Sequence, residues 1–74
     1  MAETTTTVTV AGMTCGHCVG AVTEELSKLP GVVDVRIDLV AGGESPVAIT
    51  HSAPLDDAAV AEAVDEAGYE LVRA

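Results

Sequence analysis

The sequence predicts an α+β fold in which a four-stranded antiparallel sheet carries two helices on one of its faces. Two observations support this prediction. Apolar residues alternate with polar ones in some segments, as in half-buried strands, and recur every three or four residues in others, as in amphipathic helices. Gly, Pro and Ser separate the segments, whose order is strand, helix, strand, strand, helix, strand. That order is the ferredoxin-like βαββαβ arrangement, in which right-handed crossovers place both helices on the same side of the sheet.

The first half of the chain is expected to form a strand, a helix and a second strand. Residues 4–11 favour a strand because valines alternate there with threonines. A helix is expected from residue 16 or 17 to residue 28, and Pro30-Gly31 ends it because the residue before a proline disfavours the helical conformation. The apolar stripe of this helix consists of Val19, Val22, Leu26 and Leu29. The alternating apolar residues of the second strand are Val33, Val35, Ile37 and Leu39.

The second half is expected to form a strand, a helix and a short last strand. Residues 41–46 are a turn-rich gap of hairpin length. One face of the third strand then consists of Val47, Ile49 and His51. Asp56 and Asp57 supply capping or first-turn acids to the second helix, Gly68 fits the position just past its end, and residues 69–73 form the last strand. The buried stripe of the second helix is expected to be Val60, Ala63, Val64 and Ala67.

Length and charge narrow the class of protein. With 74 residues, one Tyr and neither Phe nor Trp, the chain is expected to be one domain over 1–74 with a small aliphatic core. Its formal charge of −9 argues against nucleic acid and anionic lipid as partners and favours a protein with a basic patch. We see no signal peptide and no apolar run long enough to cross a membrane. We therefore expect a cytoplasmic protein with reduced thiols and no direct membrane insertion.

The predicted topology brings three loops to one edge of the sheet. The expected spatial order of the strands is fourth, first, third, second. The loop before the first helix, the 41–46 gap and the Gly68-Tyr69 turn then share an edge. His51 ends the third strand at the opposite edge, so we expect it to be an ordinary surface or strand-end histidine and not a metal ligand.

Both cysteines lie within residues 12–18, which read Gly-Met-Thr-Cys-Gly-His-Cys. Thiolates are soft ligands that select Cu(I), zinc and iron–sulfur centres, and the thiolate is also the reactive form in disulfide exchange. Two cysteines separated by two residues at a helix start can converge their sulfurs, and the helix N-terminus lowers the pKa of a thiol. A disulfide between Cys15 and Cys18 is the structural alternative, but it would close a very short loop and gain little chain entropy.

The number of ligands favours copper. Structural zinc uses four ligands, and iron–sulfur clusters normally use four cysteines, whereas Cys15 and Cys18 are the two ligands that the sequence predicts. The haem-attachment pattern needs a histidine directly after the second cysteine, where Val19 stands. Cu(I) is satisfied by two thiolates. Zinc or cadmium could still bind with ligands from outside the chain.

These residues resemble the heavy-metal-associated domain family, specifically the small bacterial copper chaperones. The resemblance rests on residues 12–18 after the first strand, Gly31-Val32 before the second and Gly68-Tyr69 before the fourth, and it covers nearly the whole chain. It implies Cu(I) held by Cys15 and Cys18 and delivered to the metal-binding domains of a copper-transporting P-type ATPase. A copper-bridged homodimer stays open as an alternative to a monomer.

The resemblance also concerns three residues around the ligands. Met13 matches the motif methionine, which packs beneath the loop and does not ligate. Tyr69 matches an aromatic residue whose hydroxyl lies beside the site; a partly buried strand tyrosine is the alternative. His17 is expected to point to solvent, where it tunes thiol acidity, serves as an occasional third ligand or has no role. Eukaryotic relatives carry a lysine near the last turn and a lysine-rich docking face, whereas this chain has Lys28 alone.

Three functions from different classes remain. The first is a Cu(I) chaperone, which binds and transfers metal and is not an enzyme. The second is a thiol–disulfide oxidoreductase, suggested by the cysteine spacing, although the chain lacks the thioredoxin-like context. The third is a metal-binding regulatory domain of a larger transporter. The start at Met1 and the end after the last strand favour a free-standing protein over this third function. The 41–46 gap is long for the family and serves either partner recognition or a flexible hairpin.

Overall fold

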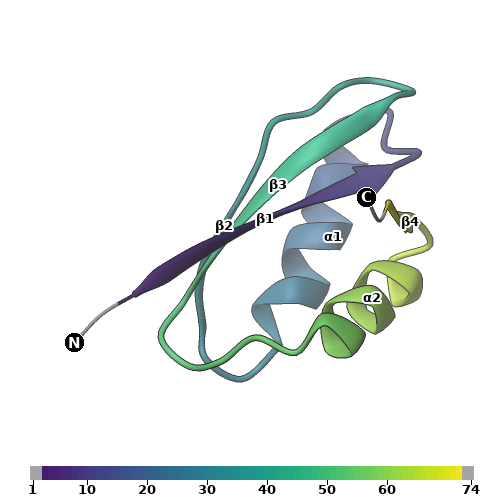
Figure 1. Ribbon diagram of the computed structural model, residues 1–74. Helices are drawn as coiled ribbons and strands as arrows, with labels where there is room; N and C mark the ends of the chain where they lie inside the picture. The colour runs from purple at the N-terminus through teal and green to yellow at the C-terminus, as the bar shows by residue number, and fades with distance from the viewer. Residues whose placement is uncertain (1–2, 73–74) are drawn as a thin grey trace.

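Six elements follow one another in the predicted order. The computed structural model describes residues 3–72. Its elements are β1 (Thr4–Ala11), α1 (Gly16–Ser27), β2 (Val32–Ile37), β3 (Glu44–His51), α2 (Asp57–Glu66) and β4 (Glu70–Val72). Both helices lie on the same side of the sheet (Figure 1). The ferredoxin-like βαββαβ prediction is therefore confirmed.

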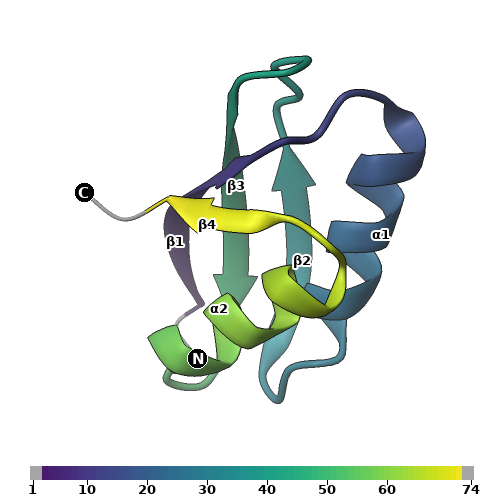
Figure 2. The same ribbon diagram turned by 90° about the vertical axis from the view of Figure 1, so that its right-hand side faces the viewer.

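The sheet is antiparallel throughout and has the strand order β2-β3-β1-β4, as expected. β1 pairs with β3 along its whole length, from Thr4 opposite His51 to Ala11 opposite Glu44. β4 pairs with only the last three residues of β1. As a result, the end of β1 that leads into α1, the turn before β3 and the start of β4 all lie at one edge of the sheet (Figure 2).

The core is small and almost wholly aliphatic. It lies between the sheet and the two helices, and each fully buried valine, leucine or isoleucine contributes roughly 1.5–3 kcal/mol of transfer free energy. Its buried members are Val10, Met13, Val22, Leu26, Val47, Ile49, Val60, Ala63 and Val64. Half of the predicted stripe of α1 (Val22 and Leu26) and most of that of α2 (Val60, Ala63 and Val64) are buried. The other predicted members are only partly buried: Val19, Leu29, which lies beyond the end of α1, and Ala67, the C-cap of α2.

The second strand differs from the predicted alternation at both ends. Val33 is 53 % exposed, because the register between β2 and β3 shifts between Val32 and Asp34 and leaves Val33 without a partner, as in a β-bulge. Val32 packs against the core instead. Leu39 lies beyond the end of β2 and is also exposed. The assignment of Val33 and Leu39 to the strand's apolar face was wrong.

The third strand begins three residues earlier than the expected Val47. It starts at Glu44, and Ser45 is completely buried on the same face as Val47 and Ile49. His51 does end this strand, but it is not at the surface. Its side chain is buried, with Nε2 2.8 Å from Thr6 Oγ1 and Nδ1 2.7 Å from the carbonyl oxygen of Ala53. Both ring nitrogens are therefore used in hydrogen bonds within the fold.

The ends of α2 follow the predicted signals. Asp56 is the N-cap, and its side chain accepts a hydrogen bond from the backbone N–H of Ala58 at 3.0 Å. Gly68 follows the C-cap with φ +91°, a conformation that glycine adopts without strain. Tyr69 precedes β4 and does not belong to it, and Arg73 lies outside the described residues.

Candidate metal centre

The two cysteines converge at the start of α1. Cys15 is the N-cap residue, with an extended backbone, and its carbonyl oxygen accepts hydrogen bonds from the N–H groups of Cys18 and Val19 at 3.1 and 3.3 Å. The Cys15 side chain makes no capping hydrogen bond, so its sulfur remains available. The two Sγ atoms are 3.8 Å apart, and both thiols are free. One ion with metal–sulfur bonds of about 2.3 Å can contact both, because the sulfurs are closer than twice that length.

The two thiols differ in exposure and in environment. Cys15 is exposed, whereas Cys18 is half-buried in the first turn of α1. The pKa of Cys18 is lowered to about 6, first by the backbone N–H of Thr14, then by the hydroxyl of Tyr69 and by the hydroxyl of Thr14. Thr14 Oγ1 lies 3.7 Å from Cys18 Sγ. Hydrogen bonds to a thiolate favour the charged form, so Cys18 is mostly ionised at neutral pH.

Thr14 contacts the Cys18 sulfur and lowers the pKa of that thiol, an effect that the sequence interpretation missed. It stands directly before Cys15 and four residues before Cys18, a spacing that brings side chains together at a helix start. A hydroxyl residue at this position was the available signal. Its hydroxyl and backbone N–H both act on the same sulfur.

Tyr69 also acts on the Cys18 thiol. Its hydroxyl donates to the Cys18 thiolate, which is the main reason why the pKa of Tyr69 is raised; partial burial is the second reason. Gly12 is packed beside its ring, since a Cβ on Gly12 would lie 3.7 Å from Tyr69 Cδ1. The structure therefore brings Tyr69 to the cysteines, where the resemblance placed it.

Met13 and His17 occupy contrasting positions. Met13 is completely buried and belongs to the core, so its side chain packs beneath the loop. His17 is exposed on α1 between the two cysteines. Its role as a tuning group, a third ligand or neither stays a prediction.

The hairpin between β2 and β3 contacts the cysteine loop directly. The N–H of Gly42 donates to the carbonyl oxygen of Met13 at 2.9 Å. The N–H of Gly12 donates to the carbonyl oxygen of Gly43 at 3.4 Å. The expected meeting of the three loops at one edge is confirmed by these bonds and by the packing of Gly12 on Tyr69.

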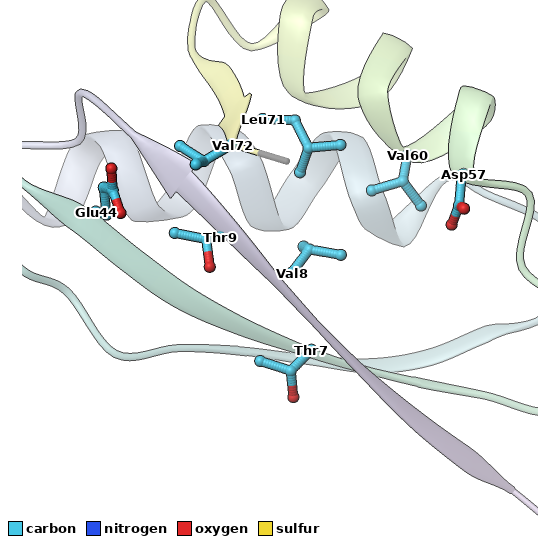
Figure 3. A pocket seen from close by; sticks show the side chains of 8 residues that line it. All are labelled: Thr7, Val8, Thr9, Glu44, Asp57, Val60, Leu71 and Val72. Carbon is cyan, nitrogen blue, oxygen red and sulfur yellow. The ribbon is translucent and has the colours of Figure 1, made fainter. Parts of the chain in front are cut away.

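Cys15 is exposed and Cys18 is half-buried, so the thiol pair is open to solvent. A cavity of about 600 Å³ lies elsewhere, between β1, β4 and α2, with Glu44 and Asp57 at its two ends (Figure 3). Its lining contains neither cysteine. Within residues 3–72, no three His, Cys, Asp or Glu side chains gather to hold a metal ion. A closed four-ligand site would therefore need donors beyond these residues.

We expect the ionisation of Cys18 to be measurable by its reactivity. In a Cys15→Ser variant, the rate of alkylation by iodoacetamide should rise with pH and level off above a midpoint near pH 6, because the thiolate is the nucleophile. Tyr69→Phe removes a hydrogen bond to the thiolate and should move the midpoint to higher pH. The Cys15→Ser variant unfolded in urea is the control, and its Cys18 thiol should titrate near the ordinary value of 9.0. A folded-state midpoint equal to the unfolded one would contradict this environment.

No helix in residues 3–72 has the length and apolar character needed to cross a bilayer.

Comparison with known proteins shows which family shares this sequence pattern. The pattern that defines the heavy-metal-associated domain matches residues 7–70. The chain is 39 % identical to the COP-associated protein of Helicobacter felis over 64 residues, which is 86 % of this chain and 92 % of that protein. It is 33 % identical to the copper chaperone CopZ of Bacillus subtilis over 67 residues, 90 % of this chain and 94 % of that protein.

Two further similarities concern a transporter and a solved structure. The chain is 33 % identical to the copper-exporting P-type ATPase of Bacillus subtilis over 63 residues, which is 85 % of this chain but 8 % of that protein. A structure described as a CopZ metallochaperone superimposes with a TM-score of 0.80 at 27 % identity and covers 93 % of this chain and 100 % of its own.

Proposed function

The chain belongs to the heavy-metal-associated domain family and is a copper chaperone, and we propose that it carries copper as Cu(I) on Cys15 and Cys18. We further propose that it acts in the cytoplasm as a single domain and passes the ion to a metal-binding domain of a copper-transporting P-type ATPase. The observation that carries this proposal is the pair of free thiols 3.8 Å apart on an exposed loop.

The ligand set supports Cu(I) over the alternatives. The site offers two soft sulfurs, one of them ionised at neutral pH because the pKa of Cys18 is about 6. Zinc prefers four ligands, whereas Cu(I) is stable with thiolates alone and in low coordination number. An exposed two-ligand site also leaves room for a third sulfur from a partner.

Copper transfer then proceeds by exchange of thiolates. An acceptor thiolate forms a third copper–sulfur bond, the bond to Cys15 breaks, and Cys15 takes up the proton that the acceptor thiol lost. A second acceptor thiol replaces Cys18 in the same way. The ion remains Cu(I) throughout, so no oxidant or reductant is needed.

The environments of the two thiols set the order of exchange. If two metal–sulfur bonds of about 2.3 Å lie in line, the sulfurs are about 4.6 Å apart, so one sulfur must move by about 0.8 Å from its observed place. Cys15 is exposed and uncommitted, whereas Thr14 and Tyr69 hold Cys18. We therefore expect Cys15 to move on loading and to leave first.

The ATPase partner is supported by kinship and by charge. Stretches of copper-transporting ATPases match this chain, so donor and acceptor would share one fold. The formal charge of −9 would speed encounter with a basic acceptor surface. The same match also fits the interpretation as a regulatory domain of a transporter, but the match to the copper chaperone CopZ over 94 % of its length favours the carrier.

The oxidoreductase alternative is less well supported. A disulfide exchange enzyme needs an accessible, ionised sulfur to attack its substrate. Here the sulfur with the lowered pKa is that of Cys18, which is the less exposed of the two. We therefore propose that the chain has no catalytic turnover.

Stopped-flow transfer of copper to an acceptor domain tests the proposed exchange. The transfer rate should rise with acceptor concentration and fall with added salt, because the encounter is electrostatically assisted. Cys15→Ser should keep copper long enough to transfer it, whereas Cys18→Ser should release it early. A rate that follows spontaneous copper release and ignores acceptor concentration would identify a copper store and not a chaperone.

A further inference from the structure

The hairpin between β2 and β3 exposes an unusual pair of apolar side chains. We call residues 38–44 the hairpin tip. Leu39 is 37 % exposed and Val40 is 46 % exposed, and their neighbours Ala41 and Gly42 are exposed as well. Val33, at 53 %, is the other large exposed apolar side chain among residues 3–72. Single exposed apolar side chains are common on protein surfaces, but here two consecutive ones stand together on a chain with a formal charge of −9.

The hairpin tip is a defined structure. The backbone N–H of Val40 donates to the buried Ser45 Oγ at 2.9 Å, and the carbonyl oxygen of Val40 accepts from the N–H of Gly43 at 3.0 Å. Ser45 Oγ also lies 3.4 Å from the same carbonyl oxygen. These bonds hold the backbone of Val40 from both sides, so its side chain remains outside. A Cβ on Gly43 would lie 3.0 Å from Val40 Cγ1, which shows how closely the turn is packed.

The hairpin tip is attached to the cysteine loop. The bonds from Gly42 to Met13 and from Gly12 to Gly43 join the two loops on either side of the buried Met13. Both loops lie at the same end of the sheet (Figure 2). A partner surface that covers the thiols would therefore come close to the hairpin tip.

We propose that the hairpin tip is a docking contact for the copper acceptor. This inference rests on the proposed function, because thiolate exchange requires an acceptor sulfur to bond to the same ion and so brings the acceptor surface onto this edge. Leu39 and Val40 supply apolar contact, and the hairpin tip also contains two exposed acidic residues, Asp38 and Glu44. The matching acceptor surface has a shallow apolar hollow bordered by lysine or arginine.

Val40→Ser is the decisive variant, with Val33→Ser as its matched control. Both change an exposed valine, but Val33 lies in the bulge beside the end of β3 farthest from the cysteine loop. The probe is the Bacillus subtilis ATPase segment that this chain matches. Val40→Ser should raise the acceptor concentration needed for half-maximal transfer by about threefold to tenfold, since it removes part of a valine's burial. Val33→Ser should leave that concentration unchanged.

Copper affinity and thermal unfolding are measured for each variant. Both should match the wild type, because Val40 is outside the core and provides no ligand. Equal transfer by Val40→Ser, Val33→Ser and the wild type would overturn the docking contact and leave the chaperone function standing. A wild type that binds copper but passes none to the acceptor by direct contact would overturn both. If Val40→Ser and Val33→Ser impaired copper transfer equally, the effect would come from a less apolar surface in general, and this would also overturn the docking contact.

Discussion

Changing both Cys15 and Cys18 to serine should abolish tight Cu(I) binding and leave the fold intact. No group of three potential ligands exists in residues 3–72 to replace the thiolates. Loss of residues that support a ligand typically costs about 10–100-fold in affinity, and loss of both ligands should cost far more. The fold should persist because Cys15 is exposed and Cys18 lies only at the edge of the core.

A competition titration under reducing, anaerobic conditions measures this loss for Cu(I), Zn(II) and Cd(II), with circular dichroism to follow the fold. His17→Ala is the matched control, since His17 lies between the cysteines and is exposed. It should change Cu(I) affinity by no more than about 100-fold, the range for supporting residues. Tight Cu(I) binding that survives in the double serine variant would refute the two-thiolate site. A His17→Ala variant as weak as that one would make His17 a ligand.

Gly31→Ala should be the most destabilising single glycine substitution. Gly31 has φ +84°, and a Cβ there would lie 2.7 Å from the Cβ of Ala53 and 3.2 Å from its backbone nitrogen. The backbone is also tied down, since the carbonyl oxygen of Gly31 accepts from the N–H of Ser52 at 2.8 Å. The left-handed conformation costs an L-residue about 1–2 kcal/mol and overpacking adds about 1–3 kcal/mol. The sum is a large part of the stability of so small a domain.

Gly68→Ala separates the two costs. Gly68 has a similar φ of +91°, but a Cβ on it would meet nothing within 4 Å. It should therefore lose only the conformational part, about 1–2 kcal/mol. Chemical denaturation of both variants measures the free energy of unfolding. If Gly31→Ala loses no more than Gly68→Ala, the segment around Ala53 moves to accept the methyl group, and the predicted clash is wrong.

Local signals were sufficient for the order and type of the elements. The helices were predictable because Val22, Leu26, Val60 and Val64 recur at helical spacing, and because Pro30-Gly31, Asp56 and Gly68 mark their ends. The prediction from alternation was wrong at Val33, because the bulge there depends on the register in which β2 pairs with β3. That pairing is formed by parts of the chain that are distant in sequence. No local pattern records that register.

The candidate site shows the same division. The cysteine pair and its place before α1 were readable from spacing, and Tyr69 from the family resemblance. The predicted topology already placed the hairpin and the cysteine loop at one edge, but it did not give the hydrogen bonds that join them or the effect of Thr14 on the Cys18 thiolate, since these depend on the final fold. His51 was expected to be a surface or strand-end histidine on the same face as Val47 and Ile49. It does end β3 on that face, but its ring is buried and bonded to Thr6 and Ala53, partners that become neighbours only in the folded chain.

Met13 makes the cysteine loop an extension of the hydrophobic core. Its side chain is completely buried and its carbonyl oxygen accepts a hydrogen bond from the N–H of Gly42, so the loop is anchored two residues before Cys15 by contacts that involve no metal. A segment that is already ordered gives up little conformational entropy when an ion arrives and regains little when it departs. Zinc fingers behave differently, because they lose their structure with their metal. This chain can instead be filled and emptied repeatedly, and each empty molecule is ready for the next ion without refolding.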